Sequence, residues 1–386
     1  MKRKLAIVIT HPIQYNAPWF KLLTERDKIE IKVFYSWGTD VLENKHDPGF
    51  GKVIQWDIPL LEGYEYEFLT NTAKDKGSHH FNGIINADAI QKIRNYDPDA
   101  LLVFGWAFQS HLKILRYFKG KIPVYFRGDS TLMNEPNGFS VKKTARRLFL
   151  TWVYRYVDIA LYVGTQNKAY FKKHGLKEDQ LVFAPHAVDN DRFEEPHELF
   201  EKEAVNIRRT LGISDEAIVF LYAGKLEPVK NPFLLLDSFL LYNKPGTHLV
   251  IIGNGVMEKA LKEKASGNPA IHFLPFKNQS EMPVAYRIGD VFVLTSFSET
   301  WALGVNEAMA CSRAILLNDR CGCAADLIYN GDNGFIYKSK NKEDLVGIMG
   351  SMNDKAVLVD MGKRSGTIVK DFSFEKICQA VENLLS

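Results

Sequence analysis

Short apolar runs alternate with amphipathic segments along most of this chain. The runs are rich in β-branched and aromatic residues and are bounded by turn-forming residues, which predicts buried strands. They lie at 5–9, 29–36, 100–104, 123–126, 159–163, 181–184, 217–223, 248–252, 271–274, 291–294, 314–317 and 334–337. Apolar residues at helical spacing predict helices at 17–23, 87–94, 111–118, 169–174, 201–211, 232–242, 257–265, 281–288, 303–311, 343–352 and 375–385. This alternation is typical of parallel βαβ units, so the expected fold class is α/β.

The strand–helix pattern is interrupted twice. Residues 38–82 contain turn signals without clear periodicity, and we interpret them as an irregular excursion. A turn-rich crossing at 185–191 leads into an acidic segment, and the pattern then restarts. Two doubly wound, Rossmann-like domains are therefore predicted, with a ligand-binding cleft between them. Their expected ranges are 1–192 with 371–386, and 193–370.

The composition excludes several classes of protein. Hydrophobic residues make up 46% of the chain and charged residues 25%, as in ordinary globular proteins. A net charge of +3 is too small to favour binding to nucleic acid. Four cysteines in 386 residues do not form a disulfide framework, which favours a reducing cytoplasm. No apolar run approaches the roughly 20 residues that span a bilayer.

Two glutamates flank the start of the helix predicted at 303–311. Glu299 lies in the loop after the strand at 291–294, and Glu307 lies one or two turns into the helix. A strand, loop and helix in this order is where open α/β sheets bind ligands, and Gly304 would let a ligand approach the helix start. Two carboxylates suit the hydroxyl groups on either side of a diphosphate, as in a nucleotide sugar. The spacing alone is equally compatible with a solvated loop glutamate and an exposed helix glutamate.

A basic cluster opens the segment at 142–156. Lys142, Lys143, Arg146 and Arg147 precede apolar residues at helical spacing, namely Leu148, Phe149, Trp152, Val153 and Tyr156. One interpretation is a helix that lies on an anionic membrane or holds an anionic acceptor through 142–147. The other is an ordinary amphipathic helix with a basic exposed face. We favour the second, because a core strand is predicted to follow.

No metal site is expected from the sequence. Two D-x-D motifs, at 97–99 and 189–191, fall on a turn and on the crossing between halves, so we interpret both as structural. His79 and His80 lie in the irregular excursion and have no carboxylate or cysteine partner at ligand spacing. Cys321 and Cys323 lack the spacing of a zinc site. No serine or cysteine occupies a G-x-S-x-G turn, so hydrolase chemistry is not supported.

Several motifs of the second half occur in the order found in one enzyme family. They are A-G-K-L-E-P-V-K-N, I-I-G-N-G, E-M-P-V-A-Y-R-I-G-D-V-F-V-L-T-S, S-E-T-W-A-L-G-V-N-E-A-M-A-C and G-C-A-A-D-L-I-Y-N-G-D-N-G-F. Over about 220–337 the chain resembles glycosyltransferase family 4, which has the GT-B fold of two Rossmann-like domains facing a central cleft. The first half is similar more loosely, through T-H-P-I-Q-Y, F-R-G-D-S and A-P-H-A-V-D-N-D-R-F.

The resemblance implies a role for each matching residue. Glu299 would lie against the donor sugar, and Lys225 with Lys230 would neutralise the diphosphate. Glu307 would hold the ribose hydroxyls. The remaining donor-binding positions would be Leu303, Gly304, Val305, Gly253 and Gly255. Candidates for contact with the acceptor or the donor sugar are His11, Gln14, Trp301, Arg127 and Asp129, the last two being equally compatible with a buried ion pair.

The implied function is retaining transfer of a hexosyl or N-acetylhexosaminyl group. The donor would be a nucleoside diphosphate sugar, UDP-linked, and the acceptor a glycan or lipid-linked glycan held by the first domain. Neither a metal nor a cofactor would be required. The enzyme would be cytoplasmic, with the inner face of the membrane as a peripheral location. A GT-B sugar-nucleotide epimerase and a non-catalytic glycan-binding relative are the alternatives.

The chain departs from the family pattern at four places. Lysine occupies position 225, where arginine is usual, and loses the bidentate fork. Ala302 replaces a common glycine, with a glycine displaced to position 304. His11 and Pro12 replace a Gly-Gly pair, and Arg127 stands where a histidine is often found. Donor specificity is expected to depend on the segment 301–304.

Overall fold

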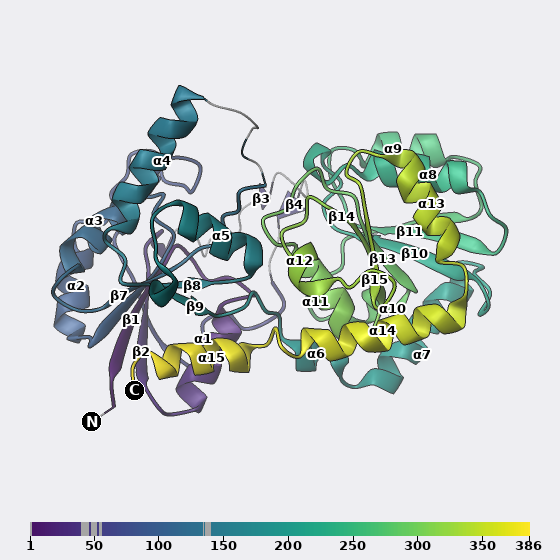
Figure 1. Cartoon of the computed structure of the whole chain (residues 1–386). Helices are drawn as coiled ribbons and strands as arrows, with labels where there is room; N and C mark the ends of the chain where they lie inside the picture. Colours follow the sequence, from purple (N-terminus) through teal and green to yellow (C-terminus); the bar gives the residue numbers. More distant parts are fainter. Residues whose placement is uncertain (1, 40–45, 48–51, 54–55, 134, 136–139) are drawn as a thin grey trace. The chain divides into compact units, whose positions relative to one another are not determined.

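The computed structural model describes residues 2–39, 46–47, 52–53, 56–133, 135 and 140–386 (Figure 1). The chain forms two compact units. The N-terminal unit comprises Met1–Lys45, Pro59–His186 and Phe374–Ser386. The C-terminal unit comprises His46–Ile58 and Ala187–Ser373. Each unit is built around its own parallel sheet, as the alternation of strands and helices predicted.

The sheet of the N-terminal unit has seven parallel strands in the order β5-β2-β1-β6-β7-β8-β9. Its strands are β1 (Lys4–Ile9), β2 (Glu30–Tyr35), β5 (Glu65–Phe68), β6 (Ala100–Phe104), β7 (Val124–Arg127), β8 (Ile159–Tyr162) and β9 (Leu181–Phe183). Its helices are α1 (Ala17–Glu25), α2 (Ala89–Tyr96), α3 (Gln109–Phe118), α4 (Val141–Tyr154), α5 (Thr165–Lys173) and α15 (Phe374–Asn383), with short 3-10 turns η2 (Phe81–Gly83) and η3 (Glu178–Gln180).

The C-terminal unit contains a parallel sheet in the order β12-β11-β10-β13-β14-β15. Its strands are β10 (Ile218–Ala223), β11 (Thr247–Ile252), β12 (Ile271–Leu274), β13 (Val291–Leu294), β14 (Ala314–Asn318) and β15 (Gly334–Tyr337). Its helices are α6 (Asn190–Glu194), α7 (His197–Thr210), α8 (Pro232–Tyr242), α9 (Glu258–Ala265), α10 (Met282–Arg287), α11 (Leu303–Ala310), α12 (Ala324–Leu327), α13 (Lys342–Ser351) and α14 (Lys355–Val369). A 3-10 turn η4 (Pro228–Lys230) and the antiparallel pair β3 (His46–Asp47) and β4 (Lys52–Val53) complete it.

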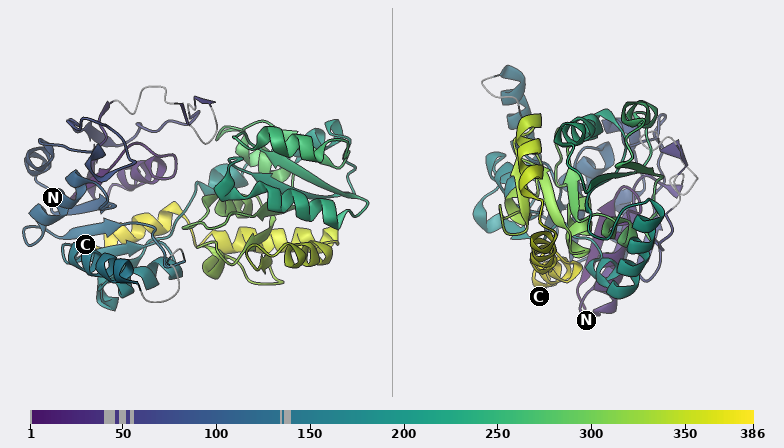
Figure 2. Two further views of the ribbon diagram at one scale, coloured as in Figure 1. Left: turned by 90° about the horizontal axis from the view of Figure 1, so that it is seen from above. Right: turned by 90° about the vertical axis from the view of Figure 1, so that its right-hand side faces the viewer.

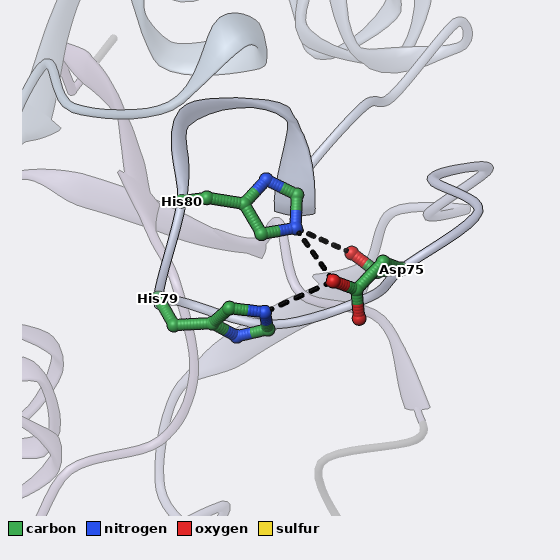
Figure 3. A group of neighbouring side chains, drawn as sticks. All are labelled: Asp75, His79 and His80. Atoms are coloured by element: carbon green, nitrogen blue, oxygen red, sulfur yellow. Dashed lines mark hydrogen bonds and ion pairs between the residues drawn. The ribbon is translucent and has the colours of Figure 1, made fainter.

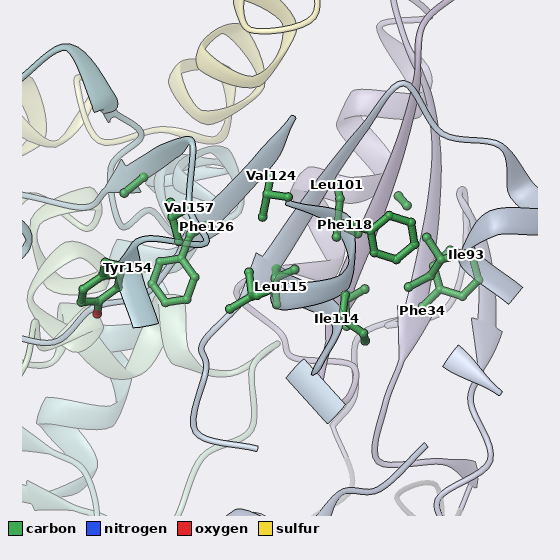
Figure 4. Packing of buried hydrophobic residues seen from close by; sticks show 14 of the residues in the cluster. Phe34, Ile93, Leu101, Ile114, Leu115, Phe118, Val124, Phe126, Tyr154 and Val157 are labelled. Carbon is green, nitrogen blue, oxygen red and sulfur yellow. The ribbon is translucent and has the colours of Figure 1, made fainter. Parts of the chain in front are cut away.

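The apolar core of the N-terminal unit is layered between its sheet and helices (Figure 4). Leu101, Val124 and Phe126 from the strands meet Leu115 and Phe118 from α3, all less than 5% exposed. Burying one such side chain contributes about 1.5–3 kcal/mol relative to leaving it in water. The continuous apolar runs predicted as strands are therefore buried because helices cover the sheet.

The helix α15 returns the end of the chain to the N-terminal unit, beside α1. Glu382 is 6% exposed and accepts two hydrogen bonds from the Arg26 guanidinium, at 2.6 and 2.8 Å. Hydrogen bonding from Arg26 lowers the pKa of the Glu382 carboxyl. Both chain ends lie close together within this unit in all three views (Figures 1 and 2).

Besides the 3-10 turns and the short elements β3, β4, α6 and α12, two elements were not predicted. Within the range interpreted as irregular, β5 joins the sheet as an edge strand, paired with β2. Its alternating residues Glu65 and Glu67 both contact Lys32, so ion pairs occupy positions where apolar residues would have signalled a strand. Helix α14 is also missing from the prediction, because its glycine and β-branched residues are weak helix formers.

His111 on α3 provides a test of the packing at the ends of β2 and β6. The imidazole is fully buried, hydrogen-bonded to Ser36 Oγ at 2.7 Å and to the Phe104 carbonyl at 2.9 Å. Burial lowers the pKa of His111 to about 4. The neutral ring therefore stabilises the fold above pH 6.5, and this contribution is lost as the pH falls from 6.5 to 4.

The expected loss is roughly 3 kcal/mol, because one unit of pKa difference corresponds to about 1.4 kcal/mol. Urea denaturation at pH 7 and pH 4 measures it, and His111→Gln serves as the comparison. The variant should be less stable at pH 7 and should lose less stability on acidification. An equal loss in both proteins would show that His111 is not the group that titrates.

Candidate functional site

Loops from neighbouring strands meet at the carboxyl edge of the C-terminal sheet. The loop after β10 bonds to the loop after β11, with Leu226 N–H donating to the Asn254 carbonyl at 2.9 Å. The loop after β13 bonds to both sides, through Phe297 N–H to the Val229 carbonyl and Glu299 N–H to the Arg320 carbonyl. The main chains of these loops thus form one connected layer, which fixes the side chains that they carry.

Gly253 and Gly255 are required for the close approach of two of these loops. A Cβ atom on Gly253 would lie 2.0 Å from the Gly224 carbonyl oxygen, and one on Gly255 would lie 2.4 Å from the Leu226 oxygen. Both glycines also have positive φ, 139° and 158°. Their immediate role is to hold the loop that carries Lys225, whose carbonyl accepts a hydrogen bond from Tyr222 at 2.8 Å.

Lys230 and Glu299 form an ion pair in this layer. The ammonium of Lys230 lies 2.6 Å from Glu299 Oε1, with the side chains 26% and 16% exposed. The Thr295 hydroxyl donates to the Lys230 and Asn231 carbonyls and fixes the end of the turn η4. The expectation that Glu299 lies on a loop is confirmed, and its carboxylate is ion-paired rather than freely solvated.

Glu307 lies within α11 and is 3% exposed. Its Oε2 accepts a hydrogen bond from the Tyr286 hydroxyl on α10 at 2.7 Å. The alternative of an exposed helix glutamate is therefore wrong. A buried carboxylate that is held by a hydroxyl group is positioned to recognise further hydroxyl groups.

The start of α11 has an unusual backbone. Ala302 precedes the helix with φ 87° and ψ 71°, the left-handed region that favours glycine. Gly304 does not take over that conformation, and a Cβ there would lie 3.1 Å from the Tyr286 hydroxyl. Alanine thus adopts the backbone conformation for which the related motif commonly uses glycine, so the displaced glycine at 304 is not a substitute for it.

Ala302→Gly is expected to raise the stability of the protein. The left-handed conformation costs alanine about 1–2 kcal/mol, and the greater flexibility of glycine in the unfolded chain offsets about half of that. A net gain of about 0.5–1 kcal/mol should raise the melting temperature by a few degrees. Thermal denaturation tests this, with Ala308→Gly inside α11 as a control that should lower the melting temperature. A lower melting temperature for Ala302→Gly would contradict the expectation.

The other predicted residues at the start of α11 differ in whether their backbone N–H groups have an acceptor within the chain. Leu303 and Gly304 lie in the first turn, where backbone N–H groups have no preceding helical acceptor. The N–H of Val305 donates to the Ala302 carbonyl at 2.9 Å, and its side chain is fully buried. A contact from the Val305 N–H to the donor, as one way for this residue to bind it, is therefore not favoured by this geometry.

Trp301 is buried, with 3% of its surface exposed. Its indole N–H donates to Asn306 Oδ1 at 2.9 Å, and its ring packs against Phe372 with centroids 5.8 Å apart. These contacts fix the loop between Glu299 and α11. We infer that Trp301 positions this loop rather than contacting the sugar.

The remaining candidates lie at the carboxyl edge of the N-terminal sheet. His11 shares a hydrogen bond with Thr10 and packs edge-on against Trp37. Gln14 is partly exposed in the same loop. These two residues follow β1 and remain candidates for ligand contact.

Arg127 is the last residue of β7 in the same sheet, and Asp129 lies in the loop after it. Arg127 is 3% exposed and donates to the Ala184 and Pro185 carbonyls, both at 2.8 Å. Burial lowers the pKa of Arg127 to about 10, opposed by the charge of Asp129. Asp129 lies 3.9 Å from His186 Nε2 and is half exposed. This geometry favours a structural role for Arg127, which fastens the segment after β9.

Tyr286 and Asn306 were not predicted as parts of the site. Their sequence signal is a polar group within a short helical segment that is mostly apolar. The burial of that segment forces each polar group to find a partner, and the partners are Glu307 and Trp301.

The expectation that the chain holds no metal site needs one correction. Among the described residues, one group of three could hold a metal ion, and it consists of Asp75, His79 and His80. The expectation that His79 and His80 lack a carboxylate partner is therefore wrong, because Asp75 lies beside both. The interpretation of Asp99 as structural is confirmed, since its carboxylate accepts hydrogen bonds from Arg3 and from the Lys4 N–H. All four cysteines are free and buried.

Comparison with known proteins agrees with the layout of the C-terminal unit. Residues 204–381 match the family model described as glycosyl transferases group 1. The chain is 25% identical over 205 residues to the D-inositol 3-phosphate glycosyltransferase of Geodermatophilus obscurus, which covers 50% of this chain and 44% of that protein. It is 23% identical over 285 residues to the UDP-Gal:alpha-D-GlcNAc-diphosphoundecaprenol alpha-1,3-galactosyltransferase of Escherichia coli, covering 69% and 71%. The chain spans about half the length of the first relatives that it matches.

Among solved structures, the whole chain resembles Anabaena HepE in complex with UDP and glucose. The TM-score is 0.69 at 17% identity, with 99% of each chain covered. Two parallel-sheet α/β units with this likeness are the GT-B fold, as the sequence predicted. Within the part of the chain that the structure describes, no helix has the length and apolar character needed to cross a bilayer.

Proposed function

We propose that this protein is a retaining glycosyltransferase. It moves a hexosyl or N-acetylhexosaminyl group from a UDP-linked sugar to a glycan or lipid-linked acceptor, in the synthesis of a cell-surface polysaccharide or glycolipid. The observation that supports this most is the arrangement of Lys230 and Glu299 as an ion pair beside the helix that buries Glu307. All three residues lie in the region that matches the glycosyl transferase model.

The donor's diphosphate requires positive charge that is already in place. Lys225 and Lys230 are partly buried on one loop, and both follow the carboxyl end of β10. When the bond to the sugar breaks, negative charge grows on the diphosphate, and preorganised charges stabilise it more than they stabilise the ground state. The N–H groups in the first turn of α11 add to this effect.

The two glutamates recognise hydroxyl groups at opposite ends of the donor. Glu307 accepts hydrogen bonds from the ribose, in the orientation that Tyr286 imposes. Glu299 lies against the transferred sugar and releases Lys230 to the diphosphate when the donor binds. The choice of UDP is supported by the UDP complex of the Anabaena relative and by the UDP-Gal specificity named for the Escherichia coli relative.

The transfer step needs no separate base. The acceptor hydroxyl attacks the anomeric carbon on the face that the diphosphate leaves, so the configuration is retained. The new carbon–oxygen bond forms as the bond to the diphosphate breaks, and the hydroxyl proton moves to the departing phosphate oxygen. Transfer is therefore expected to proceed without a metal and without a cofactor.

The acceptor binds to the N-terminal unit in this proposal. His11 and Gln14 follow the carboxyl end of β1, at the edge where parallel sheets bind ligands. A lipid-linked acceptor is supported by the diphosphoundecaprenol substrate in the name of the Escherichia coli relative.

Helix α4 is the proposed contact with the membrane surface. The structure corrects the predicted apolar face, because Val141, Leu148 and Phe149 are 77%, 68% and 41% exposed. Lys142, Arg146 and Arg147 are also exposed, in the same N-terminal part of the helix. Exposed apolar and basic side chains on one helix suit an anionic bilayer surface, where each basic residue adds about 1 kcal/mol.

Co-sedimentation with vesicles tests the membrane contact. Vesicles with anionic lipid should bind the protein, and neutral vesicles should bind it less. Val141→Glu with Leu148→Glu should abolish the difference without affecting folding, because these side chains are 77% and 68% exposed. Equal sedimentation of the variant and the unaltered protein would remove α4 from the proposal.

One assay separates the proposed function from its alternatives. The protein is incubated with a panel of nucleotide sugars and candidate acceptors, with and without EDTA. Free UDP together with a transferred sugar, unaffected by EDTA, is the expected result. A new sugar nucleotide without release of UDP would indicate an epimerase. Absence of turnover with every donor would favour a glycan-binding protein.

A further inference from the structure

A cluster of two histidines and one carboxylate lies in the N-terminal unit, between β5 and α2. Asp75 Oδ2 lies 3.1 Å from His79 Nε2 and 3.1 Å from His80 Nε2, and the three side chains converge (Figure 3). The main-chain oxygen of Asp75 is also 3.1 Å from His80 Nε2. Three side-chain donor atoms from six consecutive positions therefore lie within 4.8 Å of one another.

The loop around this cluster is held in a defined conformation. Asn71 is 6% exposed, donates to the Gly83 carbonyl at 3.0 Å, and accepts from Ala73 N–H and Ile85 N–H. Gly77 N–H donates to the Gly83 carbonyl at 3.1 Å. The base of the loop is thus closed by hydrogen bonds, which reduces the ordering that a bound ligand would have to impose.

Gly77 makes room for one of the rings. A Cβ atom at this position would lie 2.5 Å from His79 Nδ1, so any larger residue would displace the imidazole. The ring of His80 lies beside it at a centroid distance of 4.6 Å and an angle of 76°. Both Nε2 atoms can therefore reach the same point from two directions.

We propose that Asp75, His79 and His80 form a binding site for a divalent transition-metal ion, with Zn²⁺ as the preferred occupant. Two ligand atoms of a tetrahedral zinc ion, each about 2.0–2.1 Å from it, are about 3.3 Å apart. The observed 3.1 Å separations need only small side-chain movements to reach that distance. Imidazole nitrogen and carboxylate oxygen together suit zinc, whereas Mg²⁺ and Ca²⁺ prefer oxygen alone.

The site keeps one coordination position open. The side chains of Asp75 and His79 are 72% and 61% exposed, so solvent reaches the ion. Three protein ligands and one open position allow water or an oxygen of an anionic ligand to bind. Because β5 ends at Phe68, the loop leaves the sheet from its carboxyl edge, where parallel sheets bind ligands.

The neighbouring charges set a limit on affinity. Lys74 and Lys76 flank Asp75 in the sequence and oppose a cation near the carboxylate. The three proposed ligands together carry one negative charge, that of the Asp75 carboxylate. Selective binding of zinc over hard cations would therefore reflect the two imidazole nitrogens rather than a general attraction for positive charge.

Titration calorimetry of the untagged, full-length protein with ZnCl₂ tests the proposal. The unaltered protein should bind one more Zn²⁺ than the variant in which Asp75→Asn, His79→Ala and His80→Ala are combined. Each single substitution should weaken that binding at least about tenfold, since even the loss of an outer hydrogen-bonding partner costs a metal site about that much. MgCl₂ should give no binding that these substitutions remove.

His272→Gln is the matched control. His272 is hydrogen-bonded to His248 at 3.0 Å in the C-terminal unit, and this hydrogen bond joins two imidazole rings without a carboxylate. The control should keep the zinc binding that the triple variant loses. Co²⁺ provides an independent readout, because a four-coordinate site gives an intense visible absorption that the triple variant should lack.

Equal stoichiometry and affinity in the unaltered protein and the triple variant would overturn the proposal. Thermal denaturation in EDTA should be the same for both, because the three side chains lie on an exposed loop, and this separates a lost site from a lost fold. The site is independent of the proposed sugar transfer, so EDTA-resistant turnover is compatible with it.

Discussion

Lys230→Ala is expected to lower kcat for sugar transfer by about 10²- to 10³-fold, the range seen when one preorganised donor to a developing negative charge is removed. The ammonium is placed by the turn η4 and by the Thr295 hydrogen bonds, and it is paired with Glu299 at 2.6 Å. Since the charge on the diphosphate grows during bond breaking, its loss should affect kcat more than donor affinity.

Steady-state kinetics with the donor found in the panel assay measures this effect. Lys262→Ala is a matched control, because Lys262 forms an ion pair with Glu258 on the exposed surface of α9 in the same unit. The control should leave kcat unchanged. A kcat within a factor of about two for Lys230→Ala would remove Lys230 from the catalytic machinery.

Glu307→Ala is expected to weaken UDP binding by about 10- to 100-fold, while the turnover of bound donor changes less. A hydrogen bond to a charged group is worth about 1.5–3 kcal/mol, and the loss of one such bond to the ribose corresponds to about 10- to 100-fold in affinity. Titration calorimetry with UDP measures the affinity directly.

Tyr286→Phe provides the comparison for Glu307. It removes only the hydroxyl that holds Oε2 at 2.7 Å, so UDP affinity should fall by a smaller factor. Both side chains are buried, so thermal denaturation of each variant is needed to separate a loss of UDP affinity from a loss of folding. Unchanged UDP affinity in Glu307→Ala would contradict the assignment of this residue to the ribose.

The fold could be predicted because its strands are continuous apolar runs. Central runs such as 5–9, 291–294 and 314–317 are buried in a parallel sheet, where both faces are covered and no alternation is required. The edge strand β5 escaped this reasoning, since one side of it carries glutamates that pair with Lys32 and Lys92. Apolar patterning identifies central strands and misses an edge that is stabilised by charge.

The candidate site could be predicted in its residue types but not in its geometry. Spacing placed Glu299 and Glu307 around a helix start, yet only the fold shows that one is ion-paired and the other is buried under Tyr286. The left-handed Ala302 could not be anticipated, because alanine rarely adopts that conformation.

The histidine cluster escaped prediction for a different reason. Asp75 precedes His79 and His80 by four and five positions, and that spacing brings side chains together only if the loop turns back on itself. The turn depends on Asn71, whose hydrogen bonds reach residues 12 and 14 positions away. A local motif does not contain that information.

The proximity of the two chain ends within the N-terminal unit has a topological consequence (Figure 2). That unit is interrupted in sequence, because Phe374–Ser386 follows the whole of the C-terminal unit. A circular permutant that joins residue 386 to residue 1 through a short linker, and opens the chain between His186 and Ala187, would make α15 and β1 neighbours in sequence. Such rearrangements are tolerated where termini are close and exposed. The permuted chain would cross between the two units three times instead of four, at residue 373 and at both ends of His46–Ile58, so separating the units would also require replacement of that segment.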